Sequence, residues 1–300
     1  MNYIILDLEW DSVFFPPEKR FVNQILQIGA VKLDSDFCLV DTFEATVRSS
    51  VSNKVSSRFT KLTGITKEKM LSGIPLCQAI EAYNRFAQGC EVTMTWSNTD
   101  LYTIIDNQKT LLKGKVEFVF NKYLDLQKLV QAQMQQRGFD TKNQIALEAA
   151  ANIFGIDTIE FNLHTALDDS LICAELLKKC YDKKYFDALL RDTSEDGFFE
   201  RLEFKAYPIT DINDKAIDPQ SLVFDCPKCQ GKADRTRKWR YRNRWFTAAF
   251  RCRECHHKFM GRVSFKKTFD SLQVKRKTTE LKVKKNDMQS VPEKVCSKEN

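Results

Sequence analysis

The segment YIILDLEW, Tyr3 to Trp10, decides how the first part of this chain folds. Its apolar residues suit a buried β-strand, but Asp7 and Glu9 interrupt the apolar run. Because strand side chains alternate between the two faces, residues two apart point the same way and the two carboxylates stand side by side. A lone charge is costly in such a buried setting, so this pair requires a partner.

Two later segments supply further polar groups that could join this pair. Asp100 follows the strand-like segment EVTMTWS and opens a helix, where a carboxylate also meets the positive end of the helix dipole. The segment HTALDD, His164 to Asp169, adds Asp169 and the only histidine before residue 256. Carboxylates that gather repel one another unless a cation lies among them, and Mg²⁺ and Mn²⁺ take oxygen ligands. A histidine beside such ions could accept a proton from an attacking water.

Each of these features also has a purely structural interpretation. A D-x-E pair is usually a half-exposed strand face, Asp100 alone is more often a helix N-cap, and a lone His164 is more often a capping or core residue. Their joint order, spacing and secondary-structure context favour a metal site that acts on a phosphodiester.

The wider pattern predicts a mixed α/β or α+β sheet flanked by helices. Residues 3–47 have the character of three strands, and later strand-like segments alternate with segments of helical spacing. The clearest helical segments are 75–88, 123–137, 143–154 and 165–182. Strands first, followed by strands and helices in alternation, indicate this fold class.

The motifs resemble those of a known family. YIILDLEW, TWSNTD and HTALDD match, in this order, the three exonuclease motifs of the DEDDh 3′→5′ exonucleases. Residues 1–185 are similar to that family, most closely to the branch with the sporulation inhibitor KapD and the eukaryotic exoribonucleases of histone mRNA and small RNA. The resemblance implies a ribonuclease H-like fold. It also implies that His164 is the general base and that two Mg²⁺ or Mn²⁺ ions are bound by Asp7, Glu9, Asp100 and Asp169.

A cysteine module follows this region. CPKC and CREC, Cys226 to Cys229 and Cys252 to Cys255, are two C-x-x-C pairs separated by 22 residues. Four thiolates fit a closed, tetrahedral zinc site, and we expect Cys226, Cys229, Cys252 and Cys255 to hold one structural Zn²⁺ in a zinc ribbon. A module this small depends on the ion for much of its stability. A redox site or two unrelated pairs are the alternatives, and His256 and His257 could substitute as ligands.

Charge and aromatic residues suggest a partner for the ribbon. Residues 222–300 hold 22 Lys and Arg against 8 Asp and Glu, whereas the remainder of the chain is acidic. Aromatic and basic residues alternate between the C-x-x-C pairs, as in surfaces that contact phosphates and stack on bases. Alternatively, the aromatic residues fill the ribbon core. The expected nucleic-acid contacts are Arg237, Trp239, Arg240, Tyr241, Arg242, Arg244 and Trp245.

We therefore expect an exonuclease domain over 1–185, a connector over 186–221, a zinc ribbon over 222–267 and a basic, largely disordered tail over 268–300. No apolar run reaches the roughly 18 residues of a membrane span, and the N-terminus lacks a signal-peptide pattern, which predicts a cytoplasmic protein without a membrane partner. The predicted activity is metal-dependent hydrolysis at the 3′ end of single-stranded nucleic acid. RNA is favoured over DNA on the branch resemblance alone.

The competing hypothesis is a non-catalytic module that binds nucleic acid or protein on a nuclease-like fold. All five residues of the family's motifs are present, which argues against such a degenerate site.

Overall fold

The structure, a computed structural model, describes residues 2–281. The chain divides into two compact units, Met1–Glu203 and Phe204–Asn300, each with its own core. No helix among the described residues combines the length and the apolar character needed to cross a bilayer.

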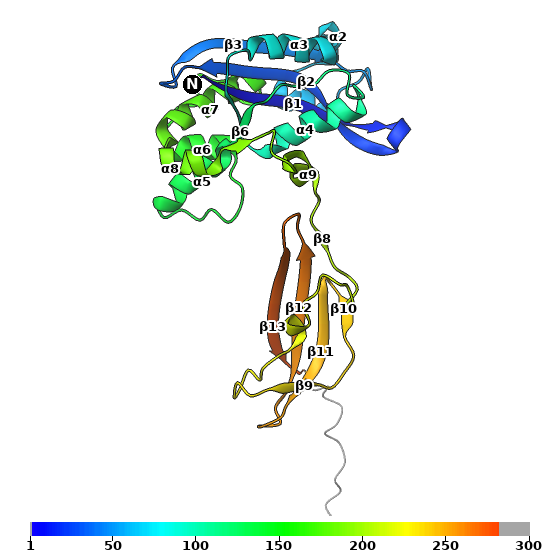
Figure 1. Ribbon diagram of the computed structural model, residues 1–300. Helices are drawn as coiled ribbons and strands as arrows, with labels where there is room; N and C mark the ends of the chain where they lie inside the picture. Colours follow the sequence, from blue (N-terminus) through cyan, green and yellow to red (C-terminus); the bar gives the residue numbers. More distant parts are fainter. Residues whose placement is uncertain (1, 282–300) are drawn as a thin grey trace, which may run out of the picture. The chain divides into compact units, whose positions relative to one another are not determined.

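The first unit is built on a seven-stranded mixed sheet with the strand order β4-β3-β2-β1-β5-β6-β7 (Figure 1). Strands β1, β2 and β3 pair antiparallel, whereas β5 lies parallel to both β1 and β6. The strands are β1 (Tyr3–Phe15), β2 (Arg20–Leu33), β3 (Leu39–Arg48), β4 (Ile74–Pro75), β5 (Val92–Thr95), β6 (Lys122–Asp125) and β7 (Arg191–Asp192).

Helices cover both faces of this sheet, as the sequence predicts. Tyr3 and Ile5 of β1 pack on one face in a core with α5, α6 and α7, and Ile4 and Leu6 pack on the other with α3. This two-sided burial explains why β1 is a continuous apolar run up to Leu6. The helices of the unit are α1 (Ser57–Thr63), α2 (Lys67–Ser72), α3 (Leu76–Phe86), α4 (Asn98–Thr110), α5 (Leu126–Gln136), α6 (Leu147–Ile153), α7 (Ala166–Cys180), α8 (Lys183–Leu189) and α9 (Phe198–Glu203).

The second unit is a β-sheet with the order β10-β11-β12-β13, to which β8 and β9 add short pairings with β12 and β11. One side of the sheet holds a core that includes Phe246, Phe250, Phe259 and Val263. The elements are β8 (Tyr207–Pro208), the 3₁₀ turn η2 (Pro219–Leu222), β9 (Ala233–Arg235), β10 (Arg240–Arg242), β11 (Trp245–Cys252), β12 (Lys258–Lys267) and β13 (Leu272–Glu280).

Two segments are more ordered than the sequence suggested. The expected connector, 186–221, is divided between the two units. Residues 186–203 belong to the first unit, where Phe186 is buried and β7 extends the sheet, and residues 204–221 belong to the second unit, where Ile209 and Ile217 are buried in the core. The expected tail contains β13, which pairs with β12 from Leu272 to Glu280. This strand has few apolar side chains, so its composition resembles that of a disordered segment. Backbone hydrogen bonds to β12 hold it in place instead. The rest of that expected tail, 282–300, lies outside the described residues.

Candidate active site and metal centres

The carboxylates of β1 lie where strand alternation places them. Asp7 and Glu9 follow Tyr3 and Ile5 on the face of β1 that packs with α7. Their neighbours on β2 are Gly29, opposite Asp7, and Gln27, opposite Glu9. The prediction that the two carboxylates share one face is confirmed.

Gly29 and Gln27 seat the first turn of α7 against this face. A Cβ on Gly29 would lie 2.1 Å from the backbone carbonyl carbon of Ala166, so only glycine permits this approach. The Gln27 Oε1 accepts a hydrogen bond of 3.2 Å from the Ala166 N–H, and the Ser170 hydroxyl donates to the Gly29 carbonyl at 3.2 Å. Asp169 is thereby held next to the β1 carboxylates. Neither β2 residue was among the predicted site residues, although a glycine within a strand signals a close contact.

We expect Gly29→Ala to destabilise the first unit by roughly 1–3 kcal/mol, because backbone atoms must move apart to admit the methyl group. The displaced atoms belong to the turn that carries Asp169. The cleavage rate should therefore fall by a larger factor than the fraction of folded protein does. Denaturant unfolding and the cleavage rate of the folded protein measure the two effects. A variant with wild-type stability and rate would show that this contact does not position α7.

Asp100 reaches the same site from the first turn of α4. It is 3% exposed, and its Oδ1 atom is buried without a hydrogen-bond partner among the described residues. The helix begins where Ser97 caps it by accepting a hydrogen bond from the Thr99 N–H. An unpartnered buried carboxylate oxygen is rare in proteins and indicates a missing cation or proton.

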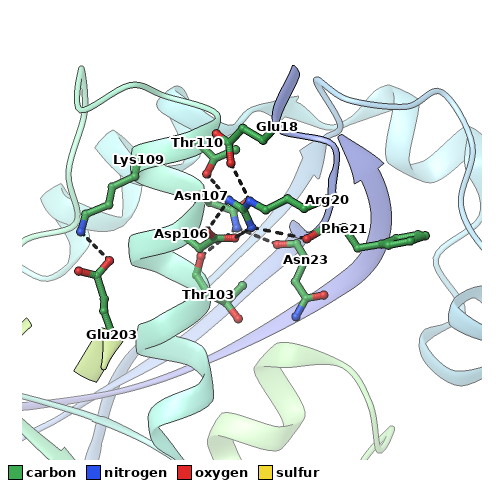
Figure 2. Close-up of polar contacts among 10 residues, drawn as sticks. All are labelled: Glu18, Arg20, Phe21, Asn23, Thr103, Asp106, Asn107, Lys109, Thr110 and Glu203. Atoms are coloured by element: carbon green, nitrogen blue, oxygen red, sulfur yellow. Dashed lines mark hydrogen bonds and ion pairs between the residues drawn. The ribbon is translucent and has the colours of Figure 1, made fainter. Parts of the chain in front are cut away.

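Helix α4 is fixed to the hairpin formed by the outer parts of β1 and β2 (Figure 2). The Arg20 guanidinium donates to both carboxylate oxygens of Asp106, at 2.8 and 3.1 Å. The buried Asn107 accepts from the Ile25 N–H at 3.2 Å and donates to the Asn23 carbonyl at 2.7 Å. Because β1 and α4 carry three of the four predicted ligands, these bonds set their relative position.

The four carboxylates resist ionisation together. Burial is the largest cause, and it raises the pKa of Glu9 to about 8, of Asp100 to about 7 and of Asp169 to about 6, from ordinary values of 4.5, 3.8 and 3.8. Burial and the charges of Asp100, Asp169 and Glu9 raise the pKa of Asp7 well above its ordinary range. All four can be ionised near neutral pH only if a cation balances them.

His164 lies at the edge of this cluster, exposed and two residues before the start of α7. Its ring nitrogen and the carboxylate oxygens of Glu9 and Asp169 lie within 4.8 Å of one another. Its backbone N–H donates to the Asp169 Oδ1 at 3.4 Å, and its φ of 67° is in the left-handed region. Non-glycine residues seldom adopt this conformation, and it is concentrated at functional sites.

Asp125 is a further carboxylate close to this cluster that the sequence analysis did not single out. It is 8% exposed, and its charge contributes to the raised pKa of Asp100. Its Oδ1 caps α5 by accepting from the Lys128 N–H, and its Oδ2 lies 3.2 Å from the Lys128 Nζ. These contacts account for Asp125 as a structural residue.

The four predicted cysteines of the second unit come together. The Sγ–Sγ distances are 3.3 Å for Cys229–Cys255, 3.4 Å for Cys229–Cys252 and 3.6 Å for Cys226–Cys255. These distances are too long for a disulfide and close to those around a tetrahedral ion with Zn–S bonds of about 2.3 Å. In the described part of the chain, this cluster contains neither His256 nor His257.

Thiol ionisation in the cluster is uneven. Burial opposes ionisation of Cys252, but backbone N–H groups of Cys255 and Glu254 lower its pKa to about 7. The Gly231 backbone favours the Cys229 thiolate, yet the neighbouring thiols raise the pKa of Cys229 to about 12. A divalent cation among the thiols would allow all four to ionise, so this donor set fits zinc.

The residues between the C-x-x-C pairs separate into different environments. Trp239 packs against Phe224 and Phe250 beside the core, which is the alternative that the sequence left open. Tyr241 packs on Phe246 with a centroid distance of 4.9 Å. The exposed residues of this segment include Arg237, Arg240, Arg242 and Arg244, and Trp245 is half-buried.

A family model described as RNase_T: Exonuclease matches residues 4–177, more than half of the chain. The chain belongs to this exonuclease family. Its site contains the four acidic residues and the histidine expected of the DEDDh type, and enzymes of this class hydrolyse phosphodiester bonds.

Solved structures share the fold of the first unit. The nuclease domain of 3′hExo, a DEDDh family member bound to rAMP, is 21% identical with a TM-score of 0.51, and the match covers 65% of this chain and 96% of that one. A 3′-exonuclease described in recognition of the histone mRNA stem-loop is 21% identical with a TM-score of 0.51, covering 64% and 84%. Cell-death related nuclease 4 is 20% identical with a TM-score of 0.50, covering 59% of this chain and 62% of that one.

These likenesses confirm the ribonuclease H-like fold of the first unit. The chain spans less than two thirds of the length of cell-death related nuclease 4. No curated protein matches the sequence.

The residues of the DEDDh site fit divalent cations. The Asp100 Oδ1 has no hydrogen-bond partner among residues 2–281, and the carboxylates Asp7, Glu9 and Asp169 converge on the same place. Hard oxygen donors of this kind select Mg²⁺ or Mn²⁺ over softer metals.

Proposed function

We propose that the protein is a 3′→5′ exonuclease that removes nucleotides from the 3′ end of single-stranded nucleic acid, with RNA preferred to DNA. The observation that carries this proposal is the convergence of Asp7, Glu9, Asp100 and Asp169 beside His164, where one buried carboxylate oxygen has no partner in the part of the chain that the structure describes. The alternative, a non-catalytic binding module, does not account for a cluster that is costly without a cation.

Each residue has a defined part in the proposed reaction. The four carboxylates would hold two Mg²⁺ or Mn²⁺ ions, which supply electrostatic stabilisation for the attacking and leaving oxygens at phosphorus. His164, exposed at the edge of the cluster, is placed to take a proton from the attacking water.

The choice of RNA rests on two similar solved structures. One is described as bound to rAMP and the other in recognition of a histone mRNA stem-loop. Discrimination would require contacts to the ribose 2′-hydroxyl. The cytoplasmic location stays a prediction from the sequence.

The test is digestion of matched RNA and DNA single strands that carry a 5′ label. We expect progressively shorter labelled products that require added Mg²⁺ or Mn²⁺, and faster loss of the RNA. Equal rates would contradict the RNA preference alone. Cuts at internal positions would contradict removal of nucleotides from the 3′ end. If neither ion supports any shortening, the exonuclease proposal fails and the non-catalytic binding module remains as the alternative.

A second prediction concerns His164. We expect His164→Asn to slow cleavage by roughly 10²–10⁴-fold, the usual contribution of a general base, and asparagine also tolerates the left-handed backbone. Added free imidazole should restore part of the variant's rate, which it would not do if His164 acted only through the fold. An undiminished rate in the variant would refute the role.

A further inference from the structure

The sheet of the second unit has a face that lies opposite its core. Directly paired residues of neighbouring strands point to the same side of a sheet. The pairs Arg242–Trp245 and Arg262–Lys277 lie on this side, and the core residues Phe246 and Val263 pair on the other. We call the positions that share a side with Trp245 and Arg262 the outer face.

The outer face is strongly basic. No acidic residue occupies an outer position on β10, β11, β12 or β13. The paired strand β9 adds Asp234, whose carboxylate is bound by Arg253 at 2.6 Å. The basic residues at the outer positions of β10 to β13 are Arg240, Arg242, Arg251, Lys258, Arg262, Lys266, Lys275 and Lys277.

Trp245 lies among these cations. The Lys277 Nζ is 4.7 Å and the Arg262 Cζ 5.1 Å from the centroid of its ring. The Arg262 Nε is buried and has no hydrogen-bond acceptor within the described residues. A buried donor of this kind requires an acceptor, and an anionic oxygen would supply the strongest bond.

A pocket of about 430 Å³ opens beside Trp245. Its lining includes the cationic side chains of Arg244, Lys266 and Lys275 together with Ser264 and Gln273. This volume lies within the usual range of small-ligand pockets, roughly 300–1,000 Å³. An aromatic ring, cations and neutral hydrogen-bonding groups thus meet at one place on an exposed sheet.

We propose that the outer face binds single-stranded nucleic acid, with phosphates on Arg262, Lys275 and Lys277 and a base stacked on Trp245. Charge complementarity selects a polyanion, and an aromatic ring within a cationic surface is how sequence-independent single-strand binders hold bases. The choice of nucleic acid over another polyanion rests on the proposed exonuclease function.

Of the contacts that the sequence suggested, Arg240, Arg242 and Trp245 lie on this face. Trp239 is occupied in packing, whereas Arg262, Lys275 and Lys277 come from strands that the sequence analysis left out of the nucleic-acid contacts. The cations lie on one surface only because β12 and β13 pair in this register.

The test measures binding of the full chain to a labelled single strand by fluorescence anisotropy over a series of salt concentrations. All proteins carry Asp7→Asn, so that the strand is not cut. Lys275→Gln/Lys277→Gln should raise the Kd roughly tenfold or more and reduce the slope of log K against log salt by about 1.4, at about 0.7 per phosphate contact. Trp245→Ala should raise the Kd by roughly 5- to 100-fold.

The matched control is Lys215→Gln/Lys228→Gln, which removes the same charge from exposed positions elsewhere in the second unit. It should leave the Kd and the salt slope near those of the parent. Thermal unfolding and zinc content should be unchanged in both double variants. An unchanged Kd in the outer-face variants overturns the proposal and assigns the face to another class of partner. An equal loss in the control also overturns it, since net charge alone would then suffice.

Cleavage of a dinucleotide separates this proposal from the exonuclease function. The Lys275→Gln/Lys277→Gln variant with Asp7 intact should cut a dinucleotide at the wild-type rate. A dinucleotide has no nucleotides beyond the active site that could bind the outer face. If the wild-type protein cuts nothing but the binding differences are found, the exonuclease proposal fails and the binding site stands. A slower dinucleotide rate in this variant would count against a separate site.

Discussion

Replacing Asp7 with asparagine should lower the rate of oligonucleotide cleavage by at least ~10³-fold, because divalent ions supply several kcal/mol of transition-state stabilisation and each 1.36 kcal/mol is tenfold in rate. Asp7 is the member of the cluster whose pKa is raised by the charges of all three other carboxylates. Its neutral amide counterpart binds hard cations weakly. Added Mg²⁺ should therefore stabilise the wild-type protein against thermal unfolding but not the variant.

The same substitution should make the metal-free first unit more stable, with a definite dependence on pH. The folded-state pKa values of Glu9, Asp100 and Asp169 are about 8, 7 and 6, above the ordinary values, so the folded protein binds protons that the unfolded chain releases. The contribution of these bound protons to the free energy of unfolding is fully present below about pH 4. It is lost as the pH rises through 6 to 8. Asp7→Asn removes one contributor to the repulsion among the carboxylates. The gain in unfolding free energy of this variant over the wild-type protein should therefore grow from pH 4 to pH 8.

Asp41→Asn is the matched control. Asp41 is an exposed residue of β3 whose carboxylate accepts a hydrogen bond from the Thr42 N–H, so neither cleavage nor the pH dependence should change. Near-normal turnover by Asp7→Asn would refute the metal assignment. If the variant's gain in unfolding free energy is equal at pH 4 and pH 8, repulsion among the carboxylates does not limit the stability of the first unit.

The ligands of this site could be predicted because each has a local signal. Asp7 and Glu9 alternate within a buried strand, Asp100 lies in the first turn of a helix after a buried strand, and Asp169 lies in the first turn of another helix. Strand alternation and helix starts depend on neighbours in the sequence, so motif and geometry agree.

The residues that support these ligands have no such signal. The contact between Gly29 and Ala166, and the bonds from Asn107 to the backbone of β2, join segments that are distant along the chain. A glycine within a strand signals that some group approaches closely, but the sequence does not say which, because the contact with α7 exists only once the sheet and the helix have packed. The same holds for Arg20, whose partner Asp106 lies on a different element.

The basic C-terminal region shows a different limit of prediction from the sequence. A strand such as β13, whose residues after Val274 are all basic, acidic or threonine, has the composition of a solvated tail, and only its pairing with β12 gives it structure. The aromatic residues between the C-x-x-C pairs could be assigned to core or surface only after the strand register was known. Trp239 packs against the core, and Trp245 lies on the outer face.

Removal of zinc, or Cys252→Ser, should unfold the second unit while the first unit remains folded. The four sulfur atoms lie within 4.8 Å of one another, and Cys226 and Cys252 are buried, so loss of the ion leaves crowded thiols beside the core of the unit. In small zinc modules the ion contributes on the order of 10 kcal/mol, as much as the whole stability of a typical domain. We expect rapid proteolysis after residue 203 and fast reaction of the freed thiols with a thiol reagent.

The first unit should keep its stability and its cleavage of a dinucleotide, since all five predicted catalytic residues and their supports lie before Glu203. Binding of long single strands should weaken, because the outer face is lost with the sheet. Cys38→Ser is the control: it removes an exposed cysteine of the first unit and should leave zinc content, proteolysis and binding unchanged. A zinc-free protein whose second unit still resists proteolysis would show that the hydrophobic core around Phe250 and Phe259 suffices for folding. In that case, the four-cysteine site would have a function other than stability.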